Sequence, residues 1–172
     1  MSIRIEPQEL FGWLQAESVA YVVLRDCDLV HPDRLSRLDD VDLLIDDAAI
    51  PALMNRFANK SGPLKLDIYG IAGEHGTGYH GAAHLPEALA RSLIEHRTIR
   101  DGVSIPAATD ELNALLYHIV YHKSVQSGLH SGDDKLSAEN DYTRRVRTLL
   151  AATGQALELT LGAFHDHLTA QG

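Results

Sequence analysis

The sequence has one cysteine and no long apolar run, and each shortage excludes a class of protein. Cys27 has no second cysteine with which to form an intramolecular disulfide, which favours a reducing compartment. No stretch approaches the roughly 18 consecutive apolar residues that indicate a membrane-spanning helix. The first twenty residues also lack the sustained apolar segment of a signal peptide. We therefore expect a cytoplasmic protein that does not enter a membrane.

Cationic residues are also scarce. The 172-residue chain has 15 Lys and Arg against 24 Asp and Glu, which gives a formal net charge of −9 with its 10 histidines neutral. Such a surface repels phosphate backbones, so nucleic acid is not an expected partner. A small phosphorylated molecule held through a metal ion is still compatible with this charge. The hydrophobic content of 45% is enough for one domain, or for one domain with a helical appendage.

The periodicity of apolar residues predicts an α/β (α+β) fold, in which a small mixed sheet is flanked by helices and followed by a C-terminal helical extension. A boundary near residue 106 separates an α/β core, 1–106, from a helical extension, 107–172, that we expect to pack on it. An Asp-Gly pair between β-rich residues predicts a hairpin at 98–106. The expected strands are 20–25, 41–45 and 64–69, and the expected helices are 7–16, 46–60, 87–96, 109–123, 137–153 and 155–169.

Acidic residues alternate with aliphatic ones on two of the expected strands. Asp40 and Asp42 share one face of the strand at 41–45, and Lys65 and Asp67 share one face of the strand at 64–69. If these faces lie on the same side of the sheet, three carboxylates converge and could bind one or two Mg²⁺ ions, or Mn²⁺. Two other interpretations stay open: the acids are solvated at the mouth of a strand, or Lys65 pairs with Asp67.

The segments YVVLR at 21–25 and DVDLLI at 40–45, followed by Asp67 on a later strand, resemble the nucleotidyltransferase fold of the DNA polymerase β superfamily. The resemblance covers about residues 18–70, and the helical tail is similar to the accessory helices of these enzymes. It implies that Asp40 and Asp42 bind the metals. It also implies that Asp67 is a third ligand or a general base, and that a nucleoside triphosphate is the co-substrate.

One position departs from the pattern of that superfamily. Arg25-Asp26 stands where the family has a Gly-Ser pair that cradles the triphosphate, and no glycine lies between Ala20 and Gly62. Glycine permits close approach of the backbone to a phosphate, whereas an aspartate opposes it. Arg25 could instead contact an anion as a fork-shaped donor.

Histidines form two further groups. His118 and His122 share a helix face, and with Tyr117 and Lys123 they give a Tyr-His-x-x-x-His-Lys pattern. This pattern resembles, more loosely, nucleotidyltransferase-like proteins found with bacterial surface-polysaccharide genes. Lys123 either extends to solvent near the negative end of the helix dipole or, with His122, holds a substrate phosphate. The histidines of the glycine-rich segment are expected at the surface or against a substrate; they are His75, His80 and His84.

The expected activity is Mg²⁺-dependent transfer of a nucleotidyl or phosphoryl group to a small hydroxylated acceptor, such as a sugar or polyol phosphate. Its expected anion contacts are Arg25, Lys65, His122 and Lys123. The alternative, favoured by the altered Arg25-Asp26 loop, is a non-catalytic ligand- or partner-binding module of antitoxin-like or regulatory type. A histidine-based metal hydrolase is a third possibility.

Overall fold

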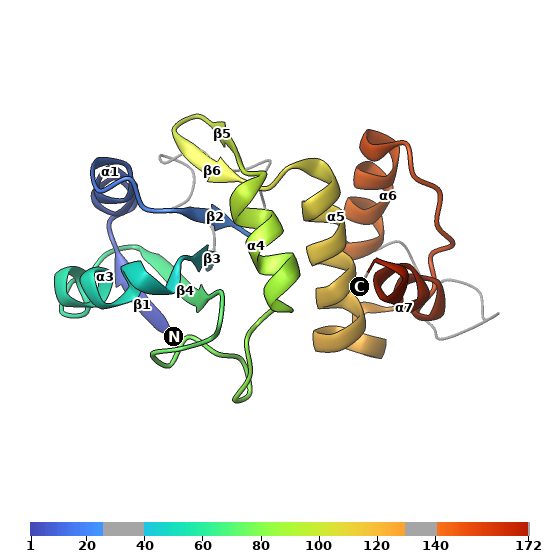
Figure 1. Cartoon of the computed structure of the whole chain (residues 1–172), viewed down its shortest axis with the longest axis horizontal. Coiled ribbons are helices and arrows are strands. Elements are labelled where there is room, and N and C mark those ends of the chain that lie inside the picture. Colours follow the sequence, from blue (N-terminus) through green and yellow to red (C-terminus); the bar gives the residue numbers. More distant parts are fainter. Residues whose placement is uncertain (26–39, 130–140, 172) are drawn as a thin grey trace. The chain divides into compact units, whose positions relative to one another are not determined.

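The computed structural model describes residues 1–25, 40–129 and 141–171 (Figure 1). The chain has a mixed α+β structure and divides into two compact units, Met1–Ala107 and Ala108–Gly172. In the described part, no helix is both long enough and apolar enough to cross a membrane. Several sequence expectations lie outside the described residues: the loop at 26–39 with Asp26 and Cys27, and the start of the helix expected at 137–153.

The first unit contains a four-stranded mixed sheet in the order β1-β4-β3-β2 (Figure 1). Strand β4 pairs antiparallel with β1 and parallel with β3, while β3 pairs antiparallel with β2. The predicted mixed sheet is therefore confirmed. The strands are β1 (Ser2–Ile5), β2 (Tyr21–Val23), β3 (Val41–Ile45) and β4 (Leu64–Gly70).

Strand β1 was not predicted from the sequence. It has only four residues and lies at the edge of the sheet, where its alternation of polar and apolar residues is too short to stand out. Its pairing partner β4 begins only at Leu64, which lies opposite Ile5. Local sequence carries no signal for a pairing over such a distance.

Two helices cover one face of this sheet. Helix α1 (Pro7–Ala16) begins at a proline as predicted, and α3 (Ile50–Phe57) follows a short 3-10 turn, η1 (Asp47–Ala49). The Asp46 carboxylate caps this turn by accepting a hydrogen bond from the Ala48 amide at 3.0 Å. The core joins both helices to the inward residues of β3 and β4: Leu10, Trp13, Leu14, Val41, Leu43, Ile45, Ile50, Leu53, Phe57, Leu64, Leu66 and Ile68.

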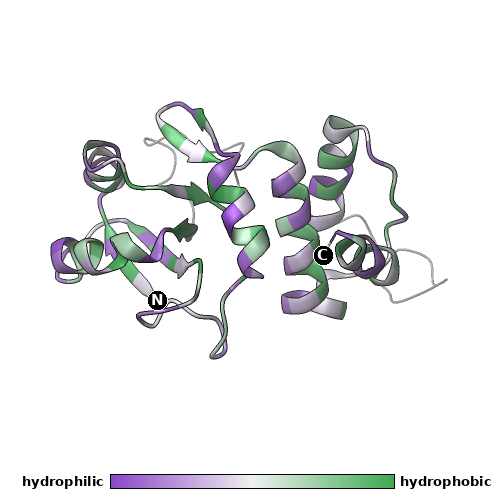
Figure 2. Ribbon diagram, in the orientation of Figure 1, coloured by the Kyte–Doolittle hydropathy of each residue, from purple (hydrophilic) through white to green (hydrophobic). Residues whose placement is uncertain are grey.

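The remaining elements of this unit are a helix and a hairpin. Helix α4 (Glu87–Glu95) contacts β2 and β3, and Figure 2 shows hydrophilic and hydrophobic residues alternating along it. Strands β5 (Thr98–Arg100) and β6 (Val103–Ile105) form the predicted hairpin. Its turn residues, Asp101 and Gly102, have φ values of 51° and 80°. Two consecutive positive φ values are what a tight two-residue hairpin loop requires.

The second unit is helical. Helix α5 (Ala108–Tyr117) continues into a π-helical turn, η2 (His118–Lys123), and a 3-10 turn, η3 (Ser124–Ser127). The sequence predicted one α-helix to residue 123, so the change of helix type at His118 corrects that expectation. Helices α6 (Asp141–Thr153) and α7 (Leu161–Ala170) complete the unit, and α7 begins later than predicted. The shared core contains Leu112, Leu116, Ile119, Leu129, Val146, Leu149, Leu161 and Phe164.

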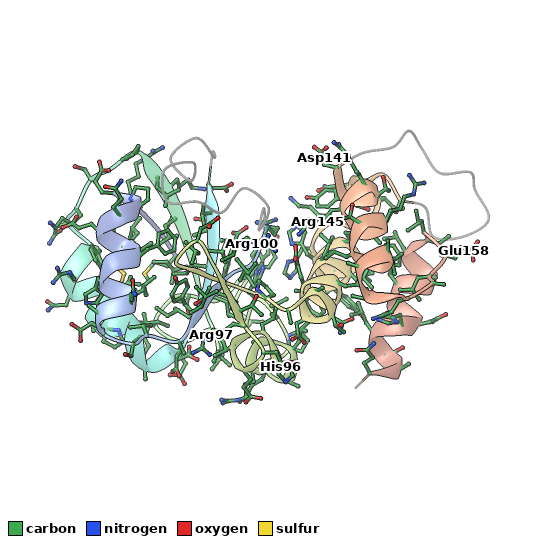
Figure 3. The ribbon with its side chains drawn as sticks, turned by 90° about the horizontal axis from the view of Figure 1, so that it is seen from above. His96, Arg97, Arg100, Asp141, Arg145 and Glu158 are labelled. Carbon is green, nitrogen blue, oxygen red and sulfur yellow. The ribbon has the colours of Figure 1, made fainter. Side chains whose placement is uncertain are left out.

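An ion pair joins α5 to α6 inside this unit. The Arg145 guanidinium, on α6 in Figure 3, donates two hydrogen bonds to the Glu111 carboxylate, whose side chain is only 9% exposed. A nearly buried carboxylate needs such a partner, because an uncompensated charge in the interior is costly. Arg145 therefore helps to hold α6 against α5.

Candidate functional site

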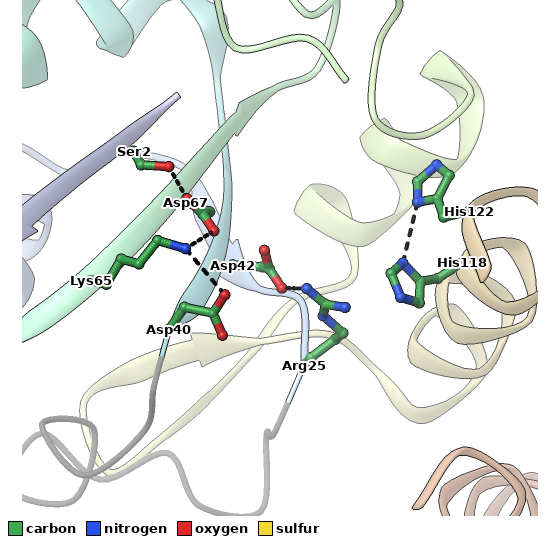
Figure 4. A network of polar contacts seen from close by, with 8 residues as sticks. All are labelled: Ser2, Arg25, Asp40, Asp42, Lys65, Asp67, His118 and His122. Atoms are coloured by element: carbon green, nitrogen blue, oxygen red, sulfur yellow. Dashed lines mark hydrogen bonds and ion pairs between the residues drawn. The ribbon is translucent and has the colours of Figure 1, made fainter. Parts of the chain in front are cut away.

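Two of the predicted acids lie side by side on the central strands. Strands β3 and β4 are parallel, and their register places Asp42 directly beside Asp67. Residues paired in this way point to the same face of a sheet, so the two carboxylates share the face opposite the core. Asp40 precedes β3 by one residue and is exposed. Figure 4 shows all three acids gathered at this part of the sheet.

Lys65 lies between two of these carboxylates. Its ammonium donates to Asp67 Oδ2 at 2.9 Å and to Asp40 Oδ2 at 3.4 Å (Figure 4). The hydrogen bond to Asp67 is the largest influence on Lys65 and raises the pKa of its ammonium. The pairing of Lys65 with Asp67, left open by the sequence, is thus present, and Asp40 belongs to the same network.

Asp42 has a different environment. Its side chain is 4% exposed, and its Oδ2 forms an ion pair with the Arg25 guanidinium (Figure 4). Its Oδ1 is buried and has no hydrogen-bond partner among the described residues. An unsatisfied buried acceptor typically costs about 1–3 kcal/mol. Asp42 therefore presents one strongly accepting oxygen that the donors of the described residues leave unsatisfied.

Asp67 is held in its ionised form. Burial raises the pKa of this carboxyl, but the hydrogen bonds from the Ser2 hydroxyl and the Lys65 ammonium outweigh burial, and the pKa lies below its usual value. Ser2 belongs to β1, opposite Asp67 in the register of β1 and β4. The contribution of Ser2 was not predicted, because the strand that carries it was not.

We expect Asp67→Asn to make stability less sensitive to acid. The pKa of Asp67 is lowered in the folded state, so its ionisation contributes stability above the ordinary pKa of 3.8, and this contribution is lost as the pH falls through the lowered value. The Asn variant has no such proton-linked loss. Its free energy of unfolding should therefore fall less steeply than that of the wild type over roughly pH 5 to pH 1.

Urea denaturation across this pH series measures the effect. Asp166→Asn is the matched control, because Asp166 is an exposed carboxylate on α7. Its profile should follow the wild type. If the stability of Asp67→Asn falls with pH as steeply as that of the wild type, the Ser2 and Lys65 contacts do not hold the Asp67 carboxylate ionised.

An aromatic pair lies on the same strand face as Lys65 and Asp67. The ring of Tyr69 stacks on that of His84, with centroids 3.8 Å apart and an interplanar angle of 21°. Burial, followed by the charge of Asp67, raises the pKa of the Tyr69 hydroxyl. The alternation of β4 could have identified Tyr69 from the sequence. The position of buried His84 depends on the path of the loop between Gly70 and Pro86, which has no periodicity.

The other two histidines of this loop differ from His84. His75 and His80 are exposed, as the sequence predicted for surface residues, and both have positive φ values, 54° and 50°. His75 Nε2 lies 3.9 Å from a carboxylate oxygen of Glu74. Neither residue is joined to the acids of β3 and β4 by a contact that the described residues show.

The donor set of these acids fits a hard divalent cation. Asp40, Asp42 and Asp67 offer only carboxylate oxygens, the ligands that Mg²⁺ and Mn²⁺ prefer. Asp42 Oδ1 is a buried acceptor without a donor among the residues that the structure describes, as expected of a metal ligand. Against this, Lys65 and Arg25 already form ion pairs with the acids, so an incoming ion must compete with both.

His122 and Lys123, the remaining predicted site residues, belong to the second unit. Both lie in η2 and are partly buried. His122 Nδ1 is 3.2 Å from His118 Nδ1 (Figure 4). Their predicted contact with a substrate phosphate stays a prediction.

Comparison of the chain with protein-family models, with curated proteins and with solved structures found no match.

Proposed function

We propose that the chain catalyses Mg²⁺-dependent transfer of a nucleotidyl or phosphoryl group to a small hydroxylated acceptor, such as a sugar or polyol phosphate. The observation that carries this proposal is the placement of Asp42 beside Asp67 on parallel strands, with Asp42 Oδ1 buried and unsatisfied by any donor in the described part of the chain. Carboxylates brought together on one sheet face repel each other unless cations are bound between them. Such a cluster is useful where phosphate chemistry needs a divalent ion.

The roles of the residues follow from their environments. Asp42, Asp67 and Asp40 would hold the ion, which when bound would polarise a phosphoryl oxygen and lower the pKa of the attacking hydroxyl. The lowered pKa of Asp67 favours a role as a ligand over a role as a general base, because a weakly basic carboxylate is a poor proton acceptor at neutral pH. Lys65 and Arg25 would contact phosphate oxygens, Arg25 with its planar fork and Lys65 as a point charge.

A specific observation favours the alternative function. Each of the three acids already has a cationic partner in its own unit: Arg25 for Asp42, and Lys65 for Asp40 and Asp67. A network in which every carboxylate has a cationic partner can be stable without a metal. A non-catalytic module that binds a ligand or a partner protein, in a regulatory or antitoxin-like role, would have the same appearance.

Thermal unfolding with Mg²⁺ and ATP or CTP separates the two functions. A ligand present at about 100 times its Kd stabilises the folded state by about 2.7 kcal/mol. For a chain of this length that corresponds to a rise in Tm of roughly 5–10 °C. We expect this rise for the wild type and for Asp166→Asn, and no rise for Asp42→Asn.

Two results would contradict the enzyme. An absence of any shift with Mg²⁺ and nucleotides would leave the non-catalytic module. An undiminished shift in Asp42→Asn would show that the nucleotide binds elsewhere. Release of pyrophosphate (for nucleotidyl transfer) or of the nucleoside diphosphate (for phosphoryl transfer) in the presence of sugar or polyol phosphates then identifies the acceptor.

A further inference from the structure

The π-helical turn η2 places two histidines against each other within the second unit. The turn directly continues α5 and runs from His118 to Lys123. Short π-helical insertions are rare, and they occur frequently at functional sites because they change which side chains share a face. In η2 the residues brought together are His118 and His122, four positions apart.

The distance between the two imidazoles matches that between two ligands of one ion. His118 Nδ1 and His122 Nδ1 are 3.2 Å apart, and the rings are nearly perpendicular, at 85°. Two nitrogens bound to one tetrahedral Zn²⁺ at 2.0–2.1 Å lie about 3.3 Å from each other. The same 3.2 Å also fits a hydrogen bond in which one Nδ1–H donates to the other Nδ1. Moving one proton from Nδ1 to Nε2 of the same ring would give both neutral imidazoles a free Nδ1 lone pair for a metal.

Aromatic rings surround this pair inside the same unit. The Tyr117 ring meets the His122 ring edge-on at 5.5 Å, and the Tyr142 ring of α6 lies 6.0 Å from that of His118. His118 is only 7% exposed, and Ile119 beside it is fully buried. Such an apolar shell limits ring rotation and lowers the local dielectric, both of which strengthen metal binding by imidazole.

We propose that His118 and His122 are two ligands of a transition-metal site that takes Zn²⁺ or a similar divalent ion such as Co²⁺. Imidazole nitrogen is a preferred ligand of these ions, whereas Mg²⁺ prefers oxygen. The remaining positions of the ion would be filled by other donor atoms, such as water oxygens. The site is independent of the function proposed for the acids of β3 and β4, because its donors and its metal class differ.

Calorimetric titration of the full-length protein with Zn²⁺, and separately with Co²⁺, tests the site. We expect saturable binding to the wild type that weakens as the pH is lowered, because a protonated imidazole has no lone pair for the metal. His122→Gln should weaken binding by roughly 100-fold or more, since even the loss of an outer partner of a metal ligand costs 10–100-fold. His118→Gln should have a similar effect.

His165→Gln is the matched control, because His165 is an exposed histidine of the same unit that bonds the Tyr121 hydroxyl at 2.8 Å. It should leave Zn²⁺ affinity unchanged. Equal affinity of His122→Gln and His165→Gln would overturn the proposal, as would an absence of binding to the wild type. His118 is buried, so circular dichroism must first show that His118→Gln is folded. If that variant does not fold, His122→Gln decides the test, because His122 is only half-buried.

Asp42→Asn separates this site from the proposed function. We expect this variant to lose the Mg²⁺-nucleotide shift and to keep wild-type Zn²⁺ affinity. Loss of Zn²⁺ binding in Asp42→Asn would overturn the assignment to the histidine pair. If Mg²⁺ and nucleotide give no shift in Tm but Zn²⁺ binds as expected, the proposed function is contradicted and the histidine site is still supported.

Discussion

Arg25→Met is expected to lower the free energy of unfolding by about 3 kcal/mol at neutral pH. Breaking a buried ion pair by removing one partner typically costs 3–5 kcal/mol, because the other charge is left uncompensated. The lower end applies here, since the Arg25 side chain is 31% exposed whereas that of Asp42 is 4% exposed. Methionine keeps much of the length of the side chain and removes only the charge and its donors. Urea denaturation, with the m-value checked for constancy, measures the change.

Arg91→Met is the matched control for this loss. Arg91 pairs with Glu87 on the surface of α4, and both side chains are more than half exposed, at 57% and 61%. Exposed pairs at this helix spacing contribute about 0.3–0.5 kcal/mol, so the control should be nearly neutral. If Arg25→Met is equally mild, Asp42 does not depend on Arg25 for its charge.

The same variant distinguishes the two proposed functions. If the acids hold a divalent cation, removal of Arg25 removes a competitor for Asp42, and Mg²⁺ should restore part of the lost stability by mass action. The double variant Arg25→Met/Asp42→Asn should be more stable than Arg25→Met without metal and should not respond to Mg²⁺. No response of Arg25→Met to Mg²⁺ would favour the non-catalytic module.

Gly62→Ala should destabilise the first unit by about 3 kcal/mol, at the upper end of the cost of overpacking. A Cβ at Gly62 would lie 2.1 Å from the carbonyl carbon of Ile5 and 2.4 Å from the amide nitrogen of Glu6. Both contacts are with backbone atoms, so no side-chain rotation relieves them. The chain must instead separate where β1 ends beside the start of β4. Thermal unfolding should show a fall in Tm of roughly 6–12 °C.

Gly12→Ala tests whether the effect is steric. Gly12 lies in the exposed middle of α1, and a Cβ there meets nothing within 4 Å. Alanine favours a helix over glycine by about 1 kcal/mol, so this variant should be more stable than the wild type. Both glycines belong to the same unit, which makes the comparison direct. If Gly62→Ala lowers the Tm only slightly, the backbone around Gly62 can move to accommodate a Cβ.

Local patterns predicted much of the first unit correctly. Pro7 at the start of an apolar helical stripe located α1, and Asp101-Gly102 between β-rich residues located the hairpin. Alternation along β4 placed Lys65 and Asp67 on one face. These features depend on interactions between residues a few positions apart, so a local sequence pattern is enough to predict them.

The residues that contact the site residues could not be predicted from local patterns. The structure places Gly62 close to Ile5, and no local pattern in the sequence indicates this approach between distant residues. Ser2 and His84 reach Asp67 and Tyr69 through a strand pairing and a loop path that have no local signal. The π-helical turn at His118 was missed because its residues have ordinary helical spacing.

The amino-acid sequence by itself determined the alternation of acidic with aliphatic residues, the net negative charge of the chain and whether most segments form a helix or a strand. Only the tertiary structure decided that Asp42 lies beside Asp67, that Arg25 and Lys65 pair with them, and that one oxygen of Asp42 has no donor within residues 1–25, 40–129 and 141–171. The physical reason is the distance along the sequence between the residues that interact. Secondary structure arises from contacts between near neighbours, whereas the charge state and hydrogen bonding of a buried carboxylate depend on groups that the sheet brings together from distant positions.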